Sequence, residues 1–171
     1  MISKFLLLSF LLFLNISSYA VPAPIGLELN KATLSDVTKK YKIIKKERNY
    51  WDGYNYFIDS KDIDLENISN ALVICDDQDI VQAIILTANK NKFQEFYEML
   101  SDKYTLKNKI IPLVGNKNAT FTNDECSIIL DAPHLSFDME LIYITDNFYK
   151  KFTSKLDKEE ELKKVKEKGT L

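Results

Sequence analysis

The sequence predicts an α+β fold, in which helices pack on one face of a single antiparallel sheet. Residues 91–104 form the clearest amphipathic helix, and the pair Asp52-Gly53 between aromatic residues is a strong hairpin signal. Short apolar runs separated by turn residues lie on both sides of that helix. Because the order of elements is similar before and after residue 91, it also suggests a tandem duplication of one helix-plus-hairpins unit.

Residues 1–20 have the features of a secretory signal peptide. Lys4 precedes an apolar run over residues 5–14, and Ser18-Tyr19-Ala20 supplies the small residues of a cleavage site. We therefore expect cleavage before Val21 and a periplasmic or secreted protein without a stable membrane anchor. An uncleaved anchor would need about 20 mainly apolar residues, and a buried core segment is the third alternative.

The remainder of the chain is long enough for one domain. Residues 21–156 are predicted to form a single α+β domain, and residues 157–171 a charged helical tail that is either solvated or binds a partner. Because the leader contains Lys4, its removal changes the net charge from −2 to −3. The basic excess that nucleic-acid binding requires is missing, so we expect no nucleic-acid partner.

Local signals place the helices and strands. Thr33 is a candidate N-cap for a short helix, with Asp36 at the third helical position. The Asp-Gly turn predicts a hairpin with Trp51 opposite Tyr54, and the polar residues 60–70 are predicted as a loop. The strand candidates share short apolar runs bounded by turn residues: 26–29, 43–50, 71–75, 80–87, 109–114, 120–121, 127–130 and 139–145.

The central helix carries an aromatic stripe on one face. At this spacing the stripe predicts packing against a sheet rather than a ligand groove. A last helix is predicted to open at Phe148 and to pack through its first turns. The stripe of the central helix consists of Phe93, Phe96, Tyr97, Leu100 and Tyr104.

Cys75 and Cys126 are the only cysteines. In an oxidising exported compartment they are predicted to form a disulfide. The alternative is that each packs as a small buried apolar residue on a separate strand.

Familiar catalytic and cofactor patterns are missing from the sequence. The four glycines lie too far apart for a phosphate-binding loop, and His134 is the only histidine. Acidic side chains gather at Asp62, Asp64 and Glu66, and again in the turn after Cys75, but without the spacing of a calcium loop. We therefore expect no catalytic residue, no metal site and no cofactor.

Aromatic residues around the first hairpin are the predicted binding surface. Flat rings at a hairpin tip can stack on a sugar or cover a partner protein, although cross-strand aromatic pairs also stabilise hairpins by themselves. Trp51 and Tyr54 are the pair expected to be exposed. The candidate binding residues are Tyr50, Trp51, Tyr54 and Tyr56.

The run from Gly26 to Val37, GLELNKATLSDV, resembles the opening of small exported bacterial modules. These are outer-membrane assembly lipoproteins of the SmpA type and β-lactamase inhibitor proteins, which repeat a helix and antiparallel strands around one sheet. Asn30 stands where those families usually have Gly, and the lipid attachment site is absent. The resemblance implies a non-enzymatic binding protein and assigns no functional residue.

These observations favour an exported protein-interaction module, such as an envelope component or an inhibitor or immunity protein, that binds a protein partner in the cell envelope. Two alternatives stay open. A carboxylate-based hydrolase of cell-wall glycans would need a cleft joining Asp62 or Asp64 to Asp76. A small-ligand carrier would need a closed apolar cavity between helix and sheet.

Overall fold

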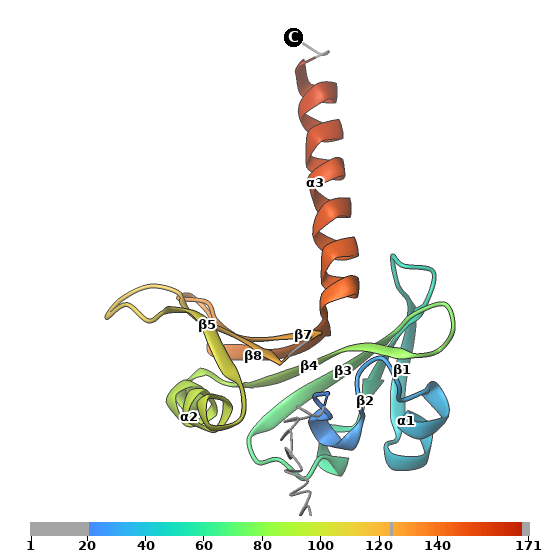
Figure 1. The fold of residues 1–171 in the computed structure, drawn as a ribbon, viewed down its shortest axis with the longest axis vertical. Coiled ribbons are helices and arrows are strands. Elements are labelled where there is room, and N and C mark those ends of the chain that lie inside the picture. Colours follow the sequence, from blue (N-terminus) through green and yellow to red (C-terminus); the bar gives the residue numbers. More distant parts are fainter. Residues whose placement is uncertain (1–20, 124, 169–171) are drawn as a thin grey trace, which may run out of the picture.

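The computed structural model describes residues 21–123 and 125–168, with side chains except at 159 and 165–168. The predicted signal peptide, residues 1–20, lies outside the described residues. The described chain folds around one antiparallel sheet of eight strands, in the order β1-β2-β3-β4-β8-β7-β6-β5 (Figure 1). The strands are β1 (Ile43–Arg48), β2 (Tyr54–Ile58), β3 (Ile68–Cys75), β4 (Val81–Asn89), β5 (Thr105–Ile110), β6 (Lys117–Asn123), β7 (Cys126–Ala132) and β8 (Asp138–Thr145).

Within the described residues, three α-helices and three 3₁₀ turns complete the fold. The helices are α1 (Leu34–Lys40), α2 (Phe93–Lys103) and α3 (Asp146–Lys168), and the turns are η1 (Pro24–Gly26), η2 (Ser60–Asp62) and η3 (Lys90–Lys92). Thr33 and Asp36 form the predicted capping box of α1. The α+β prediction is confirmed.

The fold contains two similar halves. Each half is one helix followed by four consecutive antiparallel strands, α1 with β1–β4 and α2 with β5–β8. The halves meet where β4 pairs with β8, with Ala83 opposite Ile144 and Asn89 opposite Asp138. Because that central pair is antiparallel, an approximate two-fold axis through the sheet relates the halves. The predicted tandem arrangement is therefore present in the structure.

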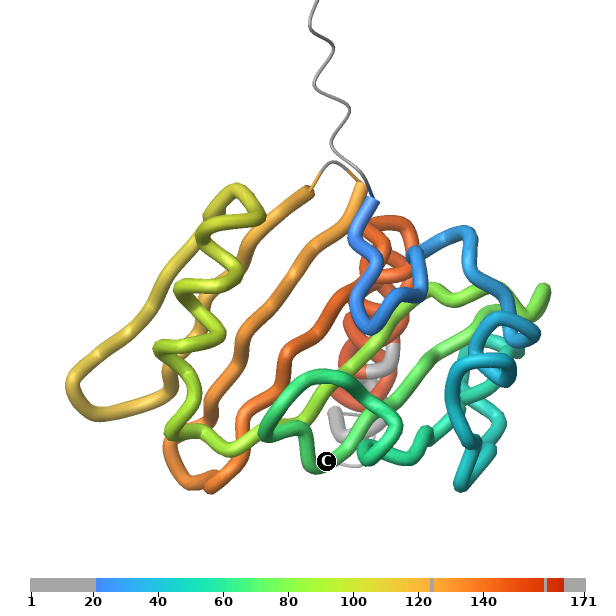
Figure 2. The backbone as a smooth tube through the Cα atoms, turned by 90° about the horizontal axis from the view of Figure 1, so that it is seen from below, coloured from blue at the N-terminus to red at the C-terminus, as the bar shows by residue number. Residues whose placement is uncertain are grey.

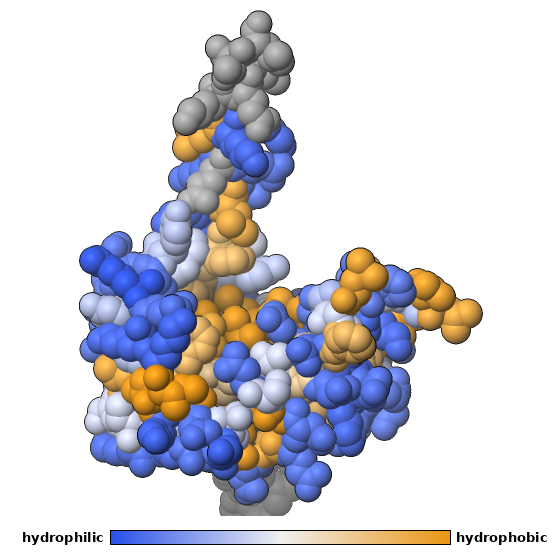
Figure 3. Space-filling view, turned by 180° about the vertical axis from the view of Figure 1, so that it is seen from behind, coloured by the Kyte–Doolittle hydropathy of each residue, from blue (hydrophilic) through white to orange (hydrophobic). Residues whose placement is uncertain are grey.

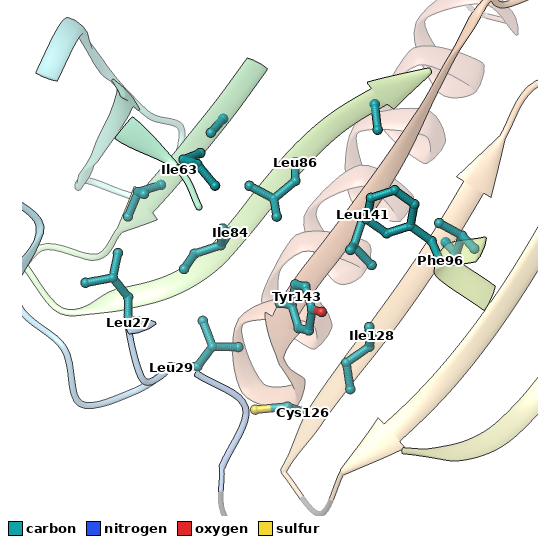
Figure 4. Packing of buried hydrophobic residues seen from close by; sticks show 14 of the residues in the cluster. Leu27, Leu29, Ile63, Ile84, Leu86, Phe96, Cys126, Ile128, Leu141 and Tyr143 are labelled. Carbon is teal, nitrogen blue, oxygen red and sulfur yellow. The ribbon is translucent and has the colours of Figure 1, made fainter. Parts of the chain in front are cut away.

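Helices α1 and α2 cover one face of the sheet, with the N-terminal segment between them (Figure 2). Val37 of α1 and Phe96 of α2 are at most 2% exposed in the main core. Leu86 and Leu141 face each other at the β4–β8 junction, and Leu27 and several further side chains of the helix-covered face join them (Figure 4). Helix α3 leaves from the opposite face of the sheet.

The predicted strand at residues 109–114 is wrong. Strand β5 follows α2 at once and ends at Ile110, while residues 111–116 form the β5–β6 loop. All six residues of β5 are exposed, because it is the edge strand and carries no buried face. An edge strand without a buried face has no alternating apolar pattern, so the apolar residues of the following loop gave a misleading strand signal.

The predicted hairpin is present but its register differs. Tyr54 pairs with Arg48 rather than with Trp51, so the loop spans residues 49–53. The Asn49 side chain fixes this loop by accepting hydrogen bonds from the Trp51 and Gly53 backbone N–H groups, at 2.9 and 3.0 Å. A Cβ atom on Gly53 would lie 2.1 Å from the Cys75 carbonyl oxygen, so close contact with β3 requires glycine here.

The disulfide prediction is also wrong. Cys75 and Cys126 are free and buried, and β4 and β8 lie between their strands. Three strand spacings separate them by about 14 Å, well beyond the roughly 4.4–6.8 Å between Cα atoms that a disulfide spans. Burial raises the pKa of Cys75 to about 12 and that of Cys126 to about 11, so both thiols stay protonated at neutral pH. They pack as small apolar side chains.

Candidate binding surface

The face of the sheet opposite α1 and α2 is called the open face here. Helix α3 rises from it, and Phe148 packs with Ala83 and Ile144 at its foot. Next to this cluster an apolar row crosses five adjacent strands and is only half-buried. Paired positions point to the same side of a sheet, so strand register places these side chains together. The row consists of Phe57, Leu72, Ile85, Ile142 and Ile129.

A polar atom on the open face also lacks a partner. Among the described residues, Asn55 Oδ1 is the buried side-chain oxygen without a hydrogen bond. Asn55 pairs with Ile74 and so lies beside the foot of α3. Because buried polar atoms are nearly always hydrogen-bonded, this shielded oxygen is a local cost to stability rather than an acceptor that a partner can reach.

Two adjacent loops at the β5 end of the sheet expose large apolar side chains. Leu113 is 100% exposed, Leu135 94%, Phe137 89% and Val114 73%. These four residues are called the apolar tip. Figure 3 shows apolar atoms at the outer end of the β5 side of the molecule and at the foot of α3. Single exposed apolar residues are ordinary on protein surfaces, but a cluster of this kind is typical of an interaction site.

Hydrogen bonds hold the loops of the apolar tip in place. The Lys90 ammonium donates to the carbonyl oxygens of Pro133, His134 and Ser136, and the Lys90 backbone N–H donates to Phe137 O at 2.9 Å. The His134 backbone N–H donates to Asn116 Oδ1 at 2.7 Å, which joins the two loops. The tip is therefore preorganised, which lowers the entropic cost of binding.

The sequence carries signals that identify the apolar tip. Pro112 precedes Leu113-Val114-Gly115, and Pro133 opens the second loop. Apolar residues enclosed by turn formers have no strand or helix in which to bury themselves. Residues 111–114 are apolar but lie in the β5–β6 loop and not in a strand.

Trp51 anchors α3 rather than forming an exposed surface. Its ring centre lies 5.8 Å from that of Phe148 and 5.7 Å from that of Phe152. Lys155 Nζ lies 4.8 Å from the Trp51 ring and donates a 2.8 Å hydrogen bond to the Tyr50 carbonyl oxygen. Trp51 is half-buried in this cluster, so its main role is to fix the base of α3.

The predicted aromatic surface is divided between the two sides of the sheet. Tyr50 is 70% exposed beside α3. Tyr54 is half-buried on the helix-covered side, where Lys46 Nζ lies 3.7 Å from its ring centre. Tyr56, also predicted as a binding residue, is only 1% exposed and belongs to the core, so it offers no exposed surface to a partner. Tyr54 and Tyr56 are two residues apart on β2 and so share the helix-covered face.

Acidic residues do not form the cleft that a glycan hydrolase would need. Asp62 and Asp64 precede β3 and Asp76 follows it, so eight residues of strand, about 26 Å, separate them. Asp76 also accepts hydrogen bonds from the Ile80 backbone N–H and from Gln82 Nε2, at 3.0 and 2.9 Å, which gives it a structural role. In the described residues no group of three or more acidic, histidine or cysteine side chains could hold a metal ion.

A groove of about 400 Å³ lies between α2 and the N-terminal segment on the helix-covered face. Leu86 and Leu141 are part of its lining, together with Phe96 of α2. Asp64 and Lys103 also line it and are exposed, so the groove opens to solvent rather than forming a closed cavity. Its volume is within the range of small-ligand sites.

Comparisons with known proteins do not assign a family. No family model, no curated protein and no solved structure matches the chain. None of the helices in residues 21–123 and 125–168 is both long and apolar enough to span a membrane.

Proposed function

We propose that the chain is an exported, non-enzymatic protein-interaction module that acts in the periplasm or outside the cell. The open face and the apolar tip form its binding surface. The observation that carries the proposal is the near-complete exposure of Leu113, Leu135 and Phe137 in loops that hydrogen bonds hold in place. A protein partner would bury these side chains as interface anchors.

The apolar tip alone can supply a free energy comparable to the cost of association. Burying one exposed large apolar side chain contributes about 1.5–3 kcal/mol. The four residues of the apolar tip therefore offer about 6–12 kcal/mol before the costs of association, which are of similar size. The half-buried row of the open face adds contact area.

The tandem build supports the same proposal. β-Lactamase inhibitor proteins, which the opening of this sequence resembles, also repeat a helix and antiparallel strands around one sheet. With α1 and α2 on one side, the part of the other face that the foot of α3 does not cover is left for a partner. An inhibitor, an immunity protein or an envelope component would each use such a surface.

The test is partner recovery from an envelope extract, with the wild-type protein and the double variant Leu135→Ser/Phe137→Ser. Both side chains are exposed, so the substitutions should change the free energy of unfolding by about 0.5 kcal/mol or less. We expect recovery to fall at least tenfold, since one anchor side chain contributes about 2 kcal/mol or more.

Ile44→Ser is the matched control. Ile44 is 58% exposed on β1, at the opposite end of the sheet. This variant should retain the partner. Equal recovery with wild type and with the double variant would exclude the apolar tip as the binding surface.

The groove beside α2 supports a second candidate, a small-ligand carrier. Its lining by Leu86, Phe96 and Leu141 favours an apolar ligand. A carrier should increase the emission of an environment-sensitive apolar dye, and Leu141→Gln should abolish that increase. An apolar dye that gains no emission with wild type would exclude this function.

A further inference from the structure

The predicted cleavage point lies beside an acidic hollow. Val21 is half-buried and packs against the main core, and the next residue, Pro22, is buried. The Leu29 backbone N–H donates to the Pro22 carbonyl oxygen at 3.1 Å, so the chain is anchored directly after Val21. Cleavage between Ala20 and Val21 would therefore create an α-ammonium group at a defined place in the fold.

That place is a hollow of about 460 Å³, of which Val21 itself is part of the lining. Glu125 and Asp146 also line it and are held side by side, because the Asp146 backbone N–H donates to the Glu125 carbonyl oxygen at 2.8 Å. Asp146 Oδ1 further accepts a hydrogen bond from the Ser127 hydroxyl at 2.8 Å. Two carboxylates therefore line the same hollow as the N-terminal segment: Glu125 from the turn before β7 and Asp146 from the start of α3.

The charged groups of the hollow are not balanced before cleavage. Three carboxylates line it against two lysine ammonium groups. Glu28 and Lys31 form an ion pair at 2.8 Å and neutralise each other. Lys150 is the second cation and forms no ion pair within 4 Å among the described side chains. One negative charge is therefore left over, and the charged groups are Glu28, Lys31, Glu125, Asp146 and Lys150.

We propose that removal of the leader creates an ion pair between the α-ammonium of Val21 and the carboxylates of Glu125 and Asp146. Hydrolysis of the Ala20–Val21 bond consumes one water molecule and leaves a carboxylate on the leader and an ammonium on the mature chain. The new charge balances the hollow. It fastens the N-terminal segment to β7 and α3, so the mature protein is more stable than its precursor.

The ion pair gives the mature protein a defined dependence on pH. A free α-amino group has a pKa of about 7.7–8.0, and nearby carboxylates raise it. A group whose pKa is raised by folding contributes stability below its unfolded pKa and loses that contribution as pH rises through its folded pKa. The added stability should therefore be present at pH 7 and absent by about pH 10.

The experiment begins with the full chain, leader included, expressed in an exporting bacterial host. Mass spectrometry of the exported product should find Val21 at the N-terminus. NMR titration of the dimethylated α-amine should then give a pKa at least about half a pH unit above that of the same modified amine in the unfolded protein.

Two variants test the partners of the ammonium. Glu125→Gln alters an exposed side chain, and adding Asp146→Asn keeps an oxygen for the Ser127 hydroxyl. The pKa should fall in Glu125→Gln and reach the unfolded value in the double variant, while Glu28→Gln should change it least. A different N-terminus, an unshifted pKa, or a raised pKa that survives the double variant would each overturn the proposal. None of these outcomes depends on a binding partner.

Discussion

Truncation of Phe148 to alanine should undock the foot of α3. Phe148 is 5% exposed, packs with Ala83 and Ile144, and meets Trp51 edge-to-face at 5.8 Å between ring centres. Removing a buried Phe costs about 3–5 kcal/mol, of which the aromatic pair contributes about 0.5–1.5 kcal/mol. The foot of α3 borders solvent and can relax, so we expect about 3 kcal/mol.

For a domain of this size, 1 kcal/mol lowers Tm by about 2–4 °C, so Phe148→Ala should lower Tm by about 6–12 °C. Trp51 is the only tryptophan, so its fluorescence reports directly on the contact with α3. Loss of the packed ring should expose the indole to water and shift its emission to longer wavelength at temperatures below the unfolding transition.

Tyr149→Ala is the control for Phe148→Ala. Tyr149 is the next residue of α3 but is 39% exposed. It should change the free energy of unfolding by less than about 1 kcal/mol and leave the Trp51 emission in place. If Phe148→Ala also cost less than about 1 kcal/mol with unchanged emission, then α3 would not be held by this aromatic cluster.

Three further predictions concern other parts of the molecule. Lys90→Met should free the β7–β8 loop, lower the free energy of unfolding by about 1–3 kcal/mol and speed amide hydrogen exchange in that loop. The control Lys92→Met removes a surface ion pair with Glu95 and should lower the free energy of unfolding by less than about 1 kcal/mol. Unchanged hydrogen exchange in the loop of Lys90→Met would contradict the role of Lys90. Cys75 and Cys126 should resist a thiol reagent until the protein unfolds, and reductant should leave Tm unchanged; rapid labelling of the native protein would contradict their burial. The cap of α1 should weaken in acid, because hydrogen bonds from Thr33 hold the pKa of Asp36 below its usual value. The stability that the ionised Asp36 contributes is present above about pH 4 and is lost as pH falls through the folded pKa. An NMR titration in which the Asp36 pKa matched that of an unfolded peptide would refute this prediction.

The sequence alone was sufficient where the signal is local. The capping box of α1 depends on Thr33 and Asp36, three residues apart. Helix α2 was predicted because Phe93, Phe96 and Leu100 recur at helical spacing, and these three side chains are buried as expected. The order of helices and strands, and with it the α+β class and the tandem halves, followed from such local patterns.

Sequence patterns gave wrong predictions where packing between distant segments determines the structure. The two cysteines look compatible with a disulfide in sequence, yet β4 and β8 separate their strands. In the first hairpin, the side chain of Asn49 and the contact of Gly53 with β3 selected a five-residue loop over the two-residue turn that Asp-Gly favours. The cysteines are kept apart by distant strands, and the hairpin loop is held against the distant Cys75 carbonyl oxygen, which accepts a hydrogen bond from Asn49 Nδ2.

The candidate surface shows the same division. The sequence alone determined which residues are aromatic or apolar and where turns interrupt them, because these properties depend on neighbours a few positions away. Only the tertiary structure decided that Tyr56 is buried, that Trp51 supports α3, and that Leu113 and Phe137 are exposed on neighbouring loops. Exposure is set by which segments cover a side chain, and those segments meet only when the sheet has formed.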